Sequence, residues 1–166
     1  MSFRIGQGYD AHRYGPGDGI VVGGERIPFD RGVVAHSDGD VLAHAVCDAM
    51  LGAAGLGDLG AWFPDSDPRY ARASSRGLLR EVRARIAEAG WQAVNVDATV
   101  VAQAPRLSGH RDAIRANLAA DLGLPVEAAS VKATTTEGMG FTGRREGIAC
   151  HAVVLLEAVP RVEGST

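Results

Sequence analysis

Segments with strand-like and helix-like patterns of apolar residues alternate along the whole chain, separated by short turns that contain glycine. Apolar residues that alternate or run together predict a strand, and apolar residues three and four positions apart predict a helix. Residues 55–68 are rich in Gly, Pro and Asp and predict a long loop. The predicted strands are 3–7, 20–22, 25–27, 94–101, 131–133 and 147–158, and the predicted helices are 41–54, 74–89 and 108–122.

This interleaving predicts an α/β (α+β) fold, with a single layer of mixed sheet and helices packed on one face. The hairpin predicted for 19–28, with Gly23-Gly24 at its turn, means that the sheet need not be entirely parallel. No internal repeat or linker interrupts the pattern. We therefore expect one catalytic domain, residues 1–166, in which 159–166 form a flexible tail.

Composition narrows the class of protein. The chain is 46% hydrophobic and 22% charged, as is ordinary for a soluble globular protein, and its net charge of −3 gives no reason to expect nucleic acid or an anionic membrane as a partner. The N-terminus lacks the features of a signal peptide, and no apolar run approaches the roughly 20 residues that span a bilayer. Cys47 and Cys150 lie in separate apolar stretches, which predicts buried free thiols. We expect a cytoplasmic protein.

Asp10 and His12 form the first candidate for a metal site. Residues i and i+2 of an extended segment point to the same side, so this carboxylate and this imidazole can bind one ion. The pair alone is a weak signal, and a histidine on a helix, such as His44, is more often structural. Together the three suit a catalytic zinc that keeps its fourth position for a substrate oxygen. Asp48, one turn after His44, is predicted to bind the other ring nitrogen of His44.

The segment HSDGD, residues 36–40, directly precedes the predicted helix 41–54. Its simplest interpretation is a polar turn in which Asp40 caps the helix. His36 would then lie near the start of the helix that carries His44, where it could donate to a phosphate oxygen or to a developing negative charge. The acidic residues of the loop 58–67 are either solvated or accept hydrogen bonds from the hydroxyls of a polyol.

Two further segments are candidates for binding a nucleotide. The run ATTTEG, residues 133–138, places hydroxyls at a strand end, where they could donate to phosphates, and Glu137 could bind a divalent ion that bridges phosphate oxygens. A polar β-turn explains the same run equally well. In AQAPRL, residues 102–107, Pro105 breaks a strand. The segment is either a simple loop, with Ser108 capping the next helix, or an opening that admits a flat base.

Five segments in this order resemble the 2-C-methyl-D-erythritol 2,4-cyclodiphosphate synthase family of isoprenoid biosynthesis: GYDAH, HSDGDVLAHAVCDAMLGAAGLGDLG, WFPDSDP, NVDATVVAQAPRL and VKATTTEGMGFTGRREGIA. The resemblance covers about 3–157, and HSDGD combined with TTTE and GFTGR is highly specific. The departures are small: Ala11 separates the first two candidate ligands, Met139 follows the glutamate loop, and Arg106 stands where lysine is frequent. They bear on nucleotide affinity and pocket shape only.

The resemblance implies an intramolecular phosphoryl transfer. The 2-phosphate of 4-diphosphocytidyl-2-C-methyl-D-erythritol 2-phosphate attacks the β-phosphorus, giving the 2,4-cyclodiphosphate and CMP. It also implies that Asp10, His12 and His44 hold Zn²⁺, that Glu137 holds Mg²⁺ or Mn²⁺ with the substrate diphosphate, and that His36 and Thr135 stabilise the transition state. The family forms a homotrimer with active sites shared between chains, and its central channel resembles a binding site for prenyl diphosphates.

The substrate contacts that the resemblance implies fall into three groups. One group surrounds the metal and the erythritol and ribose hydroxyls, a second surrounds the cytidine diphosphate, and a third lies at the far edge of the second. They are Asp10, His12, His36, Ser37, Asp58, Leu59, Gly60, Phe63, Pro64, Asp65, Ser66 and Asp67; Ala102, Gln103, Ala104, Pro105, Arg106, Leu107, Ser108, Thr134, Thr135, Thr136 and Glu137; and Phe141 and Arg144.

Two other functions fit the same residues when the resemblance is set aside. An Asp/His/His site with an open position could activate water, as in a metal-dependent phosphohydrolase or phosphodiesterase. Alternatively, Arg144 and Glu146 beside an apolar strand could line the cavity of a protein that only binds prenyl diphosphates. The product distinguishes the first alternative from a cyclase, and the intact metal and threonine positions argue against binding alone.

Overall fold

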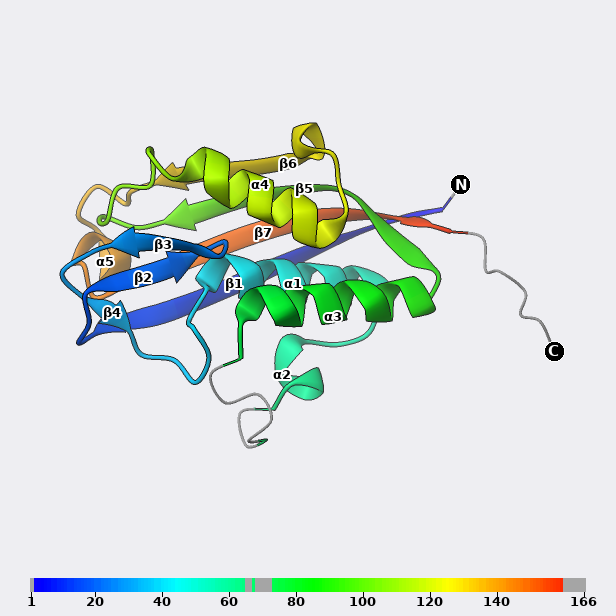
Figure 1. Cartoon of the computed structure of the whole chain (residues 1–166), viewed down its shortest axis with the longest axis horizontal. Helices are drawn as coiled ribbons and strands as arrows, with labels where there is room; N and C mark the ends of the chain where they lie inside the picture. The colour runs from blue at the N-terminus through cyan, green and yellow to red at the C-terminus, as the bar shows by residue number, and fades with distance from the viewer. Residues whose placement is uncertain (1, 65–66, 68–72, 160–166) are drawn as a thin grey trace.

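The computed structural model describes residues 2–64, 67 and 73–159 (Figure 1). The helices within these residues are α1 (Val41–Ala54), α2 (Leu59–Trp62), α3 (Ser75–Glu88), α4 (Arg111–Leu122), α5 (Gly140–Gly143) and a 3-10 turn at Val126–Ala128. The strands are β1 (Phe3–Gly15), β2 (Gly19–Val22), β3 (Glu25–Pro28), β4 (Gly32–Val33), β5 (Trp91–Val101), β6 (Ala129–Thr134) and β7 (Gly147–Ala158). The predicted flexible tail, 159–166, lies outside the described residues except for Val159.

The main sheet of the described chain has the strand order β4-β1-β7-β5-β6. β5 and β6 run parallel, and the other neighbouring strands of this sheet run antiparallel. The hairpin β2–β3 forms a small sheet of its own, and Gly23 and Gly24 at its turn adopt positive φ angles of 57° and 73°, which favour glycine. The predictions of a mixed sheet and of this hairpin are confirmed.

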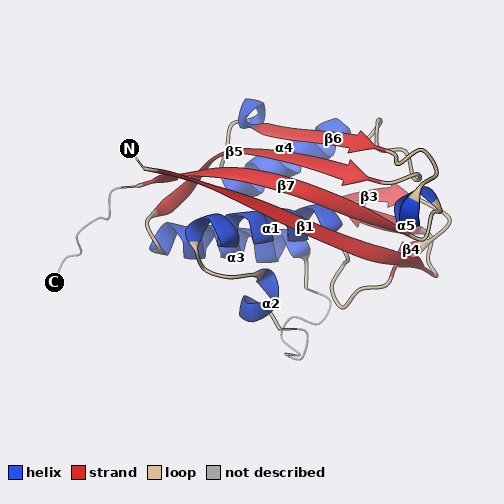
Figure 2. Ribbon diagram, turned by 180° about the vertical axis from the view of Figure 1, so that it is seen from behind, coloured by secondary structure: helices blue, strands red, loops and turns tan. Residues whose placement is uncertain are grey.

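Helices α1, α3 and α4 all lie on one face of the main sheet, as predicted, and no helix among the described residues forms a layer on the opposite face (Figures 1 and 2). α1 is nearly all buried because it lies between the sheet and α3. Its bounds are those predicted from the apolar spacing. Asp40 caps it by accepting from the N–H of Ala43, and Gly55 ends it in the left-handed conformation.

Two glycines of β1 allow α1 to lie unusually close to the strand. A Cβ atom added at Gly6 would lie 1.9 Å from the carbonyl oxygen of Ala49, and one added at Gly8 would lie 1.8 Å from the carbonyl oxygen of Ala45. Both distances are far below van der Waals contact, so these positions exclude any side chain. The close approach fixes the position of α1 relative to the part of β1 that follows Gly8.

Several elements differ from the sequence predictions. β1 continues eight residues past the predicted end at Gln7, because β7 pairs with it from Phe3 to Arg13 and supplies hydrogen bonds that local sequence does not reveal. The predicted loop 55–68 contains the short helix α2, capped by Asp58, which accepts from the N–H of Ala61. β4 and α5 are each too short to give a periodic signal.

The observed start of α4 differs from the predicted start. The sequence predicts a helix from about Ser108, and one of the two interpretations of 102–107 makes Ser108 its cap, whereas the helix begins at Arg111 and His110 occupies the cap position. The N–H of His110 donates to the carbonyl of Leu107 at 2.9 Å, so residues 107–110 close a separate turn. That turn leaves Ser108 outside the helix and beside the preceding loop.

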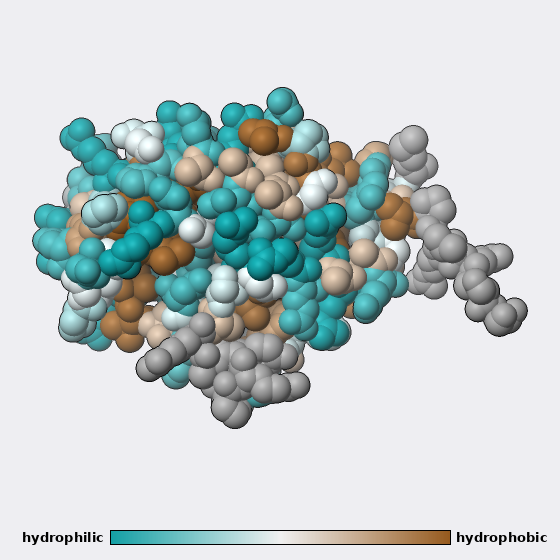
Figure 3. Space-filling view, viewed as in Figure 1, coloured by the Kyte–Doolittle hydropathy of each residue, from teal (hydrophilic) through white to brown (hydrophobic). Residues whose placement is uncertain are grey.

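The two faces of the molecule differ in polarity. The helix side is largely hydrophilic, with scattered apolar residues (Figure 3). Large apolar side chains are exposed on β1 and β7, among them Phe3, Ile5, Tyr9 and Val153. Cys47 and Cys150 are fully buried free thiols, as predicted. Within the described residues, none of the helices has the length and hydrophobicity to cross a membrane.

Candidate active site

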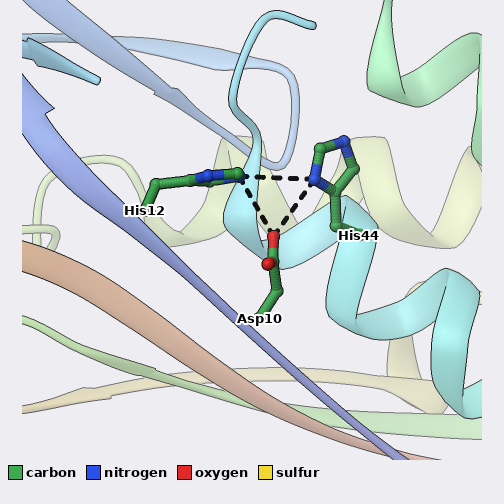
Figure 4. Close-up of side chains that lie close together, drawn as sticks. All are labelled: Asp10, His12 and His44. Atoms are coloured by element: carbon green, nitrogen blue, oxygen red, sulfur yellow. Dashed lines mark hydrogen bonds and ion pairs between the residues drawn. The ribbon is translucent and has the colours of Figure 1, made fainter. Parts of the chain in front are cut away.

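Asp10 and His12 project from β1 toward α1, on the same face of the strand as Gly8. His44 lies on the first turn of α1 and points back toward them (Figure 4). The close approach at Gly8 brings the backbone of Ala45, the next residue of the helix, against the strand. The three predicted metal ligands, 34 residues apart in sequence at most, therefore meet between β1 and α1.

The geometry of this cluster fits a tetrahedral zinc ion. Oδ2 of Asp10 lies 3.0 Å from Nε2 of His12 and 3.1 Å from Nδ1 of His44, and the two nitrogens are 3.3 Å apart. Ligand atoms about 2.0–2.1 Å from a tetrahedral zinc are about 3.3–3.4 Å from one another. Two imidazoles and one carboxylate also form a donor set typical of catalytic zinc.

The charge state of the cluster favours a cation. Burial acts to raise the pKa of Asp10, but hydrogen bonds and charge interactions with His12 and His44 outweigh burial and hold this pKa well below its usual range. Burial acts to lower the pKa of His44, but the hydrogen bond and negative charge of Asp10, with Asp40 and Asp38 nearby, raise it overall. The carboxylate of Asp10 is therefore ionised, and protons compete with a metal for His44.

The predicted role of Asp48 is wrong. Asp48 accepts a hydrogen bond from the backbone N–H of Leu59 at 2.7 Å and thereby ties α1 to the start of α2. Nε2 of His44 instead lies 2.9 Å from Oγ of Ser75 and 3.3 Å from Oγ of Ser37. Spacing on one helix suggested Asp48, but the hydroxyl that reaches the ring belongs to another helix.

A cavity of about 370 Å³ opens beside the cluster of Asp10, His12 and His44. The structure brings His36 to it, together with Ser37, and adds Asp48, Val34 and Ala35, which the sequence did not assign to the substrate. Burial raises the pKa of Asp48, helped by the negative charges of Asp58 and Asp10 and opposed by the Leu59 N–H. The predicted contacts that line this cavity are Asp10, His12, His36, Ser37, Leu59, Gly60 and Phe63.

The other predicted contacts of this group that the structure describes do not line this cavity. Asp58 caps α2 and does not line the cavity. Pro64 is also outside the lining, and its carbonyl accepts from the N–H of Asp67 at 2.9 Å. Asp65 and Ser66 lie outside the described residues.

A second cavity of about 330 Å³ lies where β5 and β6 end. It is lined by most of the predicted cytidine contacts, by Ala133 at the start of the run 133–138, and by Arg111, which the sequence did not single out. Arg111 could have been predicted from the sequence as a phosphate contact, because it is a cation at the start of the helix that follows the loop. The predicted contacts in the lining are Ala102, Gln103, Pro105, Arg106, Leu107, Ser108, Thr134 and Thr135. Ala104 is turned away, its carbonyl accepting from the hydroxyl of Tyr14 at 2.6 Å.

Glu137 lies at an exposed turn next to the second cavity. Its φ of 54° is in the left-handed region, which is uncommon for a residue with a side chain. Oε1 of Glu137 accepts from the hydroxyl of Thr135 at 3.1 Å. The N–H of Gly138 donates to Oε1 of Gln103 at 3.2 Å, which links this turn to the 102–108 loop. The carboxylate is therefore free on its solvent side to bind a cation.

A third cavity, of about 600 Å³, has Phe141 in its lining. Tyr9, Arg13 and Glu146 also line it. Arg144 lines none of these three cavities and pairs with Glu146, with its Nε 2.8 Å from Oε1 of Glu146. The structure thus places Phe141 and Arg144 away from the lining of the second cavity in a single chain.

Comparisons with known proteins give a consistent result. The model of the YgbB family matches residues 3–157. A protein of Methylococcus capsulatus named 2-C-methyl-D-erythritol 2,4-cyclodiphosphate synthase is 66% identical over 154 residues, covering 93% of this chain and 98% of that protein.

Two solved structures share the fold. A Plasmodium falciparum IspF in complex with CDP aligns with a TM-score of 0.83 and 35% identity, over 95% of this chain and 97% of that one. The bifunctional IspDF of Campylobacter jejuni aligns with a TM-score of 0.91 and 42% identity, over 95% of this chain but 42% of that longer chain.

Proposed function

The chain belongs to the YgbB family, and from this premise we propose which residues carry out its reaction. It converts 4-diphosphocytidyl-2-C-methyl-D-erythritol 2-phosphate to 2-C-methyl-D-erythritol 2,4-cyclodiphosphate and CMP, a lyase step of the non-mevalonate pathway to isoprenoid precursors. An oxygen of the 2-phosphate forms a bond to the β-phosphorus, and the bond from that phosphorus to the oxygen of CMP breaks. No protein nucleophile is required, so the protein has to fold the substrate and neutralise its charge.

The observation that carries the assignment is the Asp10–His12–His44 cluster beside a cavity that His36 also lines. These three residues are proposed to hold Zn²⁺, and Glu137 is proposed to hold Mg²⁺ or Mn²⁺ together with the substrate diphosphate. When bound, the two ions polarise phosphate oxygens and offset their negative charge. Asp10 and His12 also contact the substrate in this assignment.

His36 and Thr135 are proposed to donate hydrogen bonds to the phosphoryl group as charge develops on it. His36 is supported by its place in the cavity beside the metal cluster. Thr135 is supported by its place in the second cavity and by its hydrogen bond to Glu137.

The substrate is proposed to bind in two halves. The erythritol phosphate and the ribose hydroxyls bind beside the metal cluster, at Ser37, Asp58, Leu59, Gly60 and the segment 63–67. The cytidine diphosphate binds at 102–108 and 134–137, with Phe141 and Arg144 at its far edge. The basic side chains of Arg106 and Arg111 line the second cavity and fit a loop that receives a nucleotide.

We propose that the protein, as a single catalytic domain of 1–166, forms a homotrimer in the cytoplasm with active sites shared between chains. The two cavities of one chain have no lining residue in common, which supports completion of each site by a neighbouring chain. The exposed Phe3, Ile5 and Val153 supply an apolar surface for such contacts. The third cavity, with aromatic and charged lining, is the proposed site for a prenyl diphosphate.

Incubation with the cytidine-linked substrate, zinc and magnesium, followed by phosphorus NMR, tests the reaction. We expect resonances of a cyclic diphosphate and of CMP. Ring-free hydrolysis products would instead indicate a phosphohydrolase, and an unchanged substrate would indicate binding alone. Light scattering tests the assembly, because a fully active monomer of 17.3 kDa would refute the shared site.

A further inference from the structure

The ring of His44 is held on the side away from the metal cluster by a buried serine. Ser75, the first residue of α3, has no exposed surface, and its Oγ lies 2.9 Å from Nε2 of His44. Oγ of Ser37 is farther from the same nitrogen, at 3.3 Å. The shorter of the two contacts therefore comes from a residue that does not line the cavity beside the cluster.

Ser75 is itself held by Asp38, in the turn before α1. The backbone N–H of Ser75 donates to Oδ2 of Asp38 at 2.9 Å, and its hydroxyl donates to Oδ1 in a short hydrogen bond. Oδ1 also accepts from the N–H of Asp40 at 3.2 Å. An ionised carboxylate only accepts hydrogen bonds, so the hydroxyl hydrogen of Ser75 points to Asp38. A lone pair of the Ser75 oxygen is then left to accept from His44.

The direction of this hydrogen bond determines the form of the imidazole. Because Ser75 accepts, Nε2 of His44 carries the hydrogen, and in the neutral ring Nδ1 is then unprotonated. Nδ1 is the atom that faces Asp10 and His12. Its lone pair is thus available in the tautomer that a metal requires, and the ring cannot rotate without breaking the contact to Ser75.

We propose that Ser75 and Asp38 are positioning residues of the metal site, and that the chain Asp38–Ser75–His44 fixes the tautomer and orientation of the zinc ligand. This inference rests on the zinc assignment proposed above. Partners on the far ring nitrogen of a metal-bound histidine commonly orient the ring and increase its basicity. Here the carboxylate acts through a hydroxyl, which joins α1, α3 and the turn before α1 at the site. Ser37 remains available to the substrate.

Zinc affinity measured by chelator competition provides the test. Ser75→Ala removes the hydroxyl without adding bulk, and we expect zinc to bind about 10–100-fold more weakly, the usual cost of losing such a partner. Ser74→Ala is the matched control: Ser74 precedes Ser75, is exposed and makes no side-chain hydrogen bond to the helix. The control should bind zinc as the parent does. Equal zinc affinity in the parent and Ser75→Ala, or equal losses in both variants, would overturn the proposal.

A second pair of measurements separates positioning from a general loss of structure. In the metal-free parent, where the ionised carboxylate of Asp10 can accept from Nδ1, nitrogen-15 NMR should still show hydrogen on Nε2 of His44. Ser75→Ala should lose this hydrogen from part of the population while the protein stays folded. If Ser75→Ala does not fold, Asp38→Asn takes its place in both assays, because the amide cannot accept from both the hydroxyl and the N–H of Ser75. A parent protein in which Nε2 of His44 carries no hydrogen would contradict the proposal.

Zinc affinity and the tautomer of His44 distinguish failure of the metal assignment from failure of the positioning role. A parent protein that binds no zinc would overturn the metal assignment, whereas the tautomer of His44 in the metal-free protein still tests the chain through Ser75. Conversely, tight zinc binding with an unperturbed tautomer in Ser75→Ala would leave the metal assignment intact and reject the positioning role. If both residues act through His44, the double variant Ser75→Ala, Asp38→Asn should lose less affinity than the sum of the single losses.

Discussion

Replacing Gly8 with alanine would place a methyl group inside the backbone of α1. The new Cβ would lie 1.8 Å from the carbonyl oxygen of Ala45 and 2.7 Å from the amide nitrogen of Ala49. Ordinary contact begins at 3.4 Å, so the helix has to move away from β1 by about 1.6 Å, the difference between 3.4 and 1.8 Å. Neither obstructing atom belongs to a side chain that could rotate away. The strain must therefore be relieved by moving the helix itself.

The displacement has two measurable consequences. Overpacking costs about 1–3 kcal/mol, and a clash with fixed backbone belongs at the upper end of that range. A loss of about 3 kcal/mol lowers the Tm of a chain of this size by roughly 6–12 °C. Because Ala45 adjoins His44, the shift also carries Nδ1 away from Oδ2 of Asp10, now 3.1 Å distant. Metal–ligand distances tolerate only about 0.2 Å, so the variant should also lose bound zinc.

Calorimetry at one protein concentration and metal analysis of the purified variant are the assays. Gly52→Ala provides a control on the same helix, since a Cβ at Gly52 meets no atom within 4 Å and the residue is exposed. Alanine is the better helix former by about 0.5–1 kcal/mol, so the control should be slightly more stable and keep its zinc. Gly8→Ala with the Tm and zinc content of the parent would refute the argument that close approach at β1 builds the site.

Three further predictions concern individual side chains. Glu137→Gln should lose activity, and excess magnesium should partly restore it while the zinc content stays normal. The reason is that Glu137 and its hydroxyl neighbours hold a hard cation only with substrate oxygens; loss of zinc together with activity would contradict this. Thr135→Val and His36→Ala should each lower kcat by about 10²–10³, or roughly 3–4 kcal/mol, with little change in KM, as for loss of a transition-state donor; a change in KM alone would show that they only hold the substrate. Burial raises the pKa of Cys47 well above its usual value and that of Cys150 to about 12. Neither thiol should therefore react with a thiol reagent at pH 8 until the protein unfolds, and rapid labelling of the native protein would be inconsistent with this burial.

The sequence by itself determined the features that depend on neighbouring residues along the chain. Apolar spacing gave α1 with its observed bounds, Asp40 as its cap and the hairpin 19–28, because these patterns follow from the 3.6-residue and two-residue periods of helix and strand. It also indicated that Asp10 and His12 could bind one ion together, since residues two apart share one side of an extended segment. The motifs indicated the family before any contact was known.

Tertiary structure decided which distant groups meet. The sequence pointed to Asp48 as the partner of His44 because it lies on the same helix, yet Asp48 binds the start of α2, and Ser75, 31 residues from His44, reaches the ring. Asp40 also accepts from the N–H groups of Gly23 and Gly24, far from the helix that it caps. The physical reason is that such contacts depend on how closely α1 lies on β1 and how α3 covers it. The distance between α1 and β1 is set by the absence of side chains at Gly6 and Gly8, and no local periodicity of the sequence encodes it.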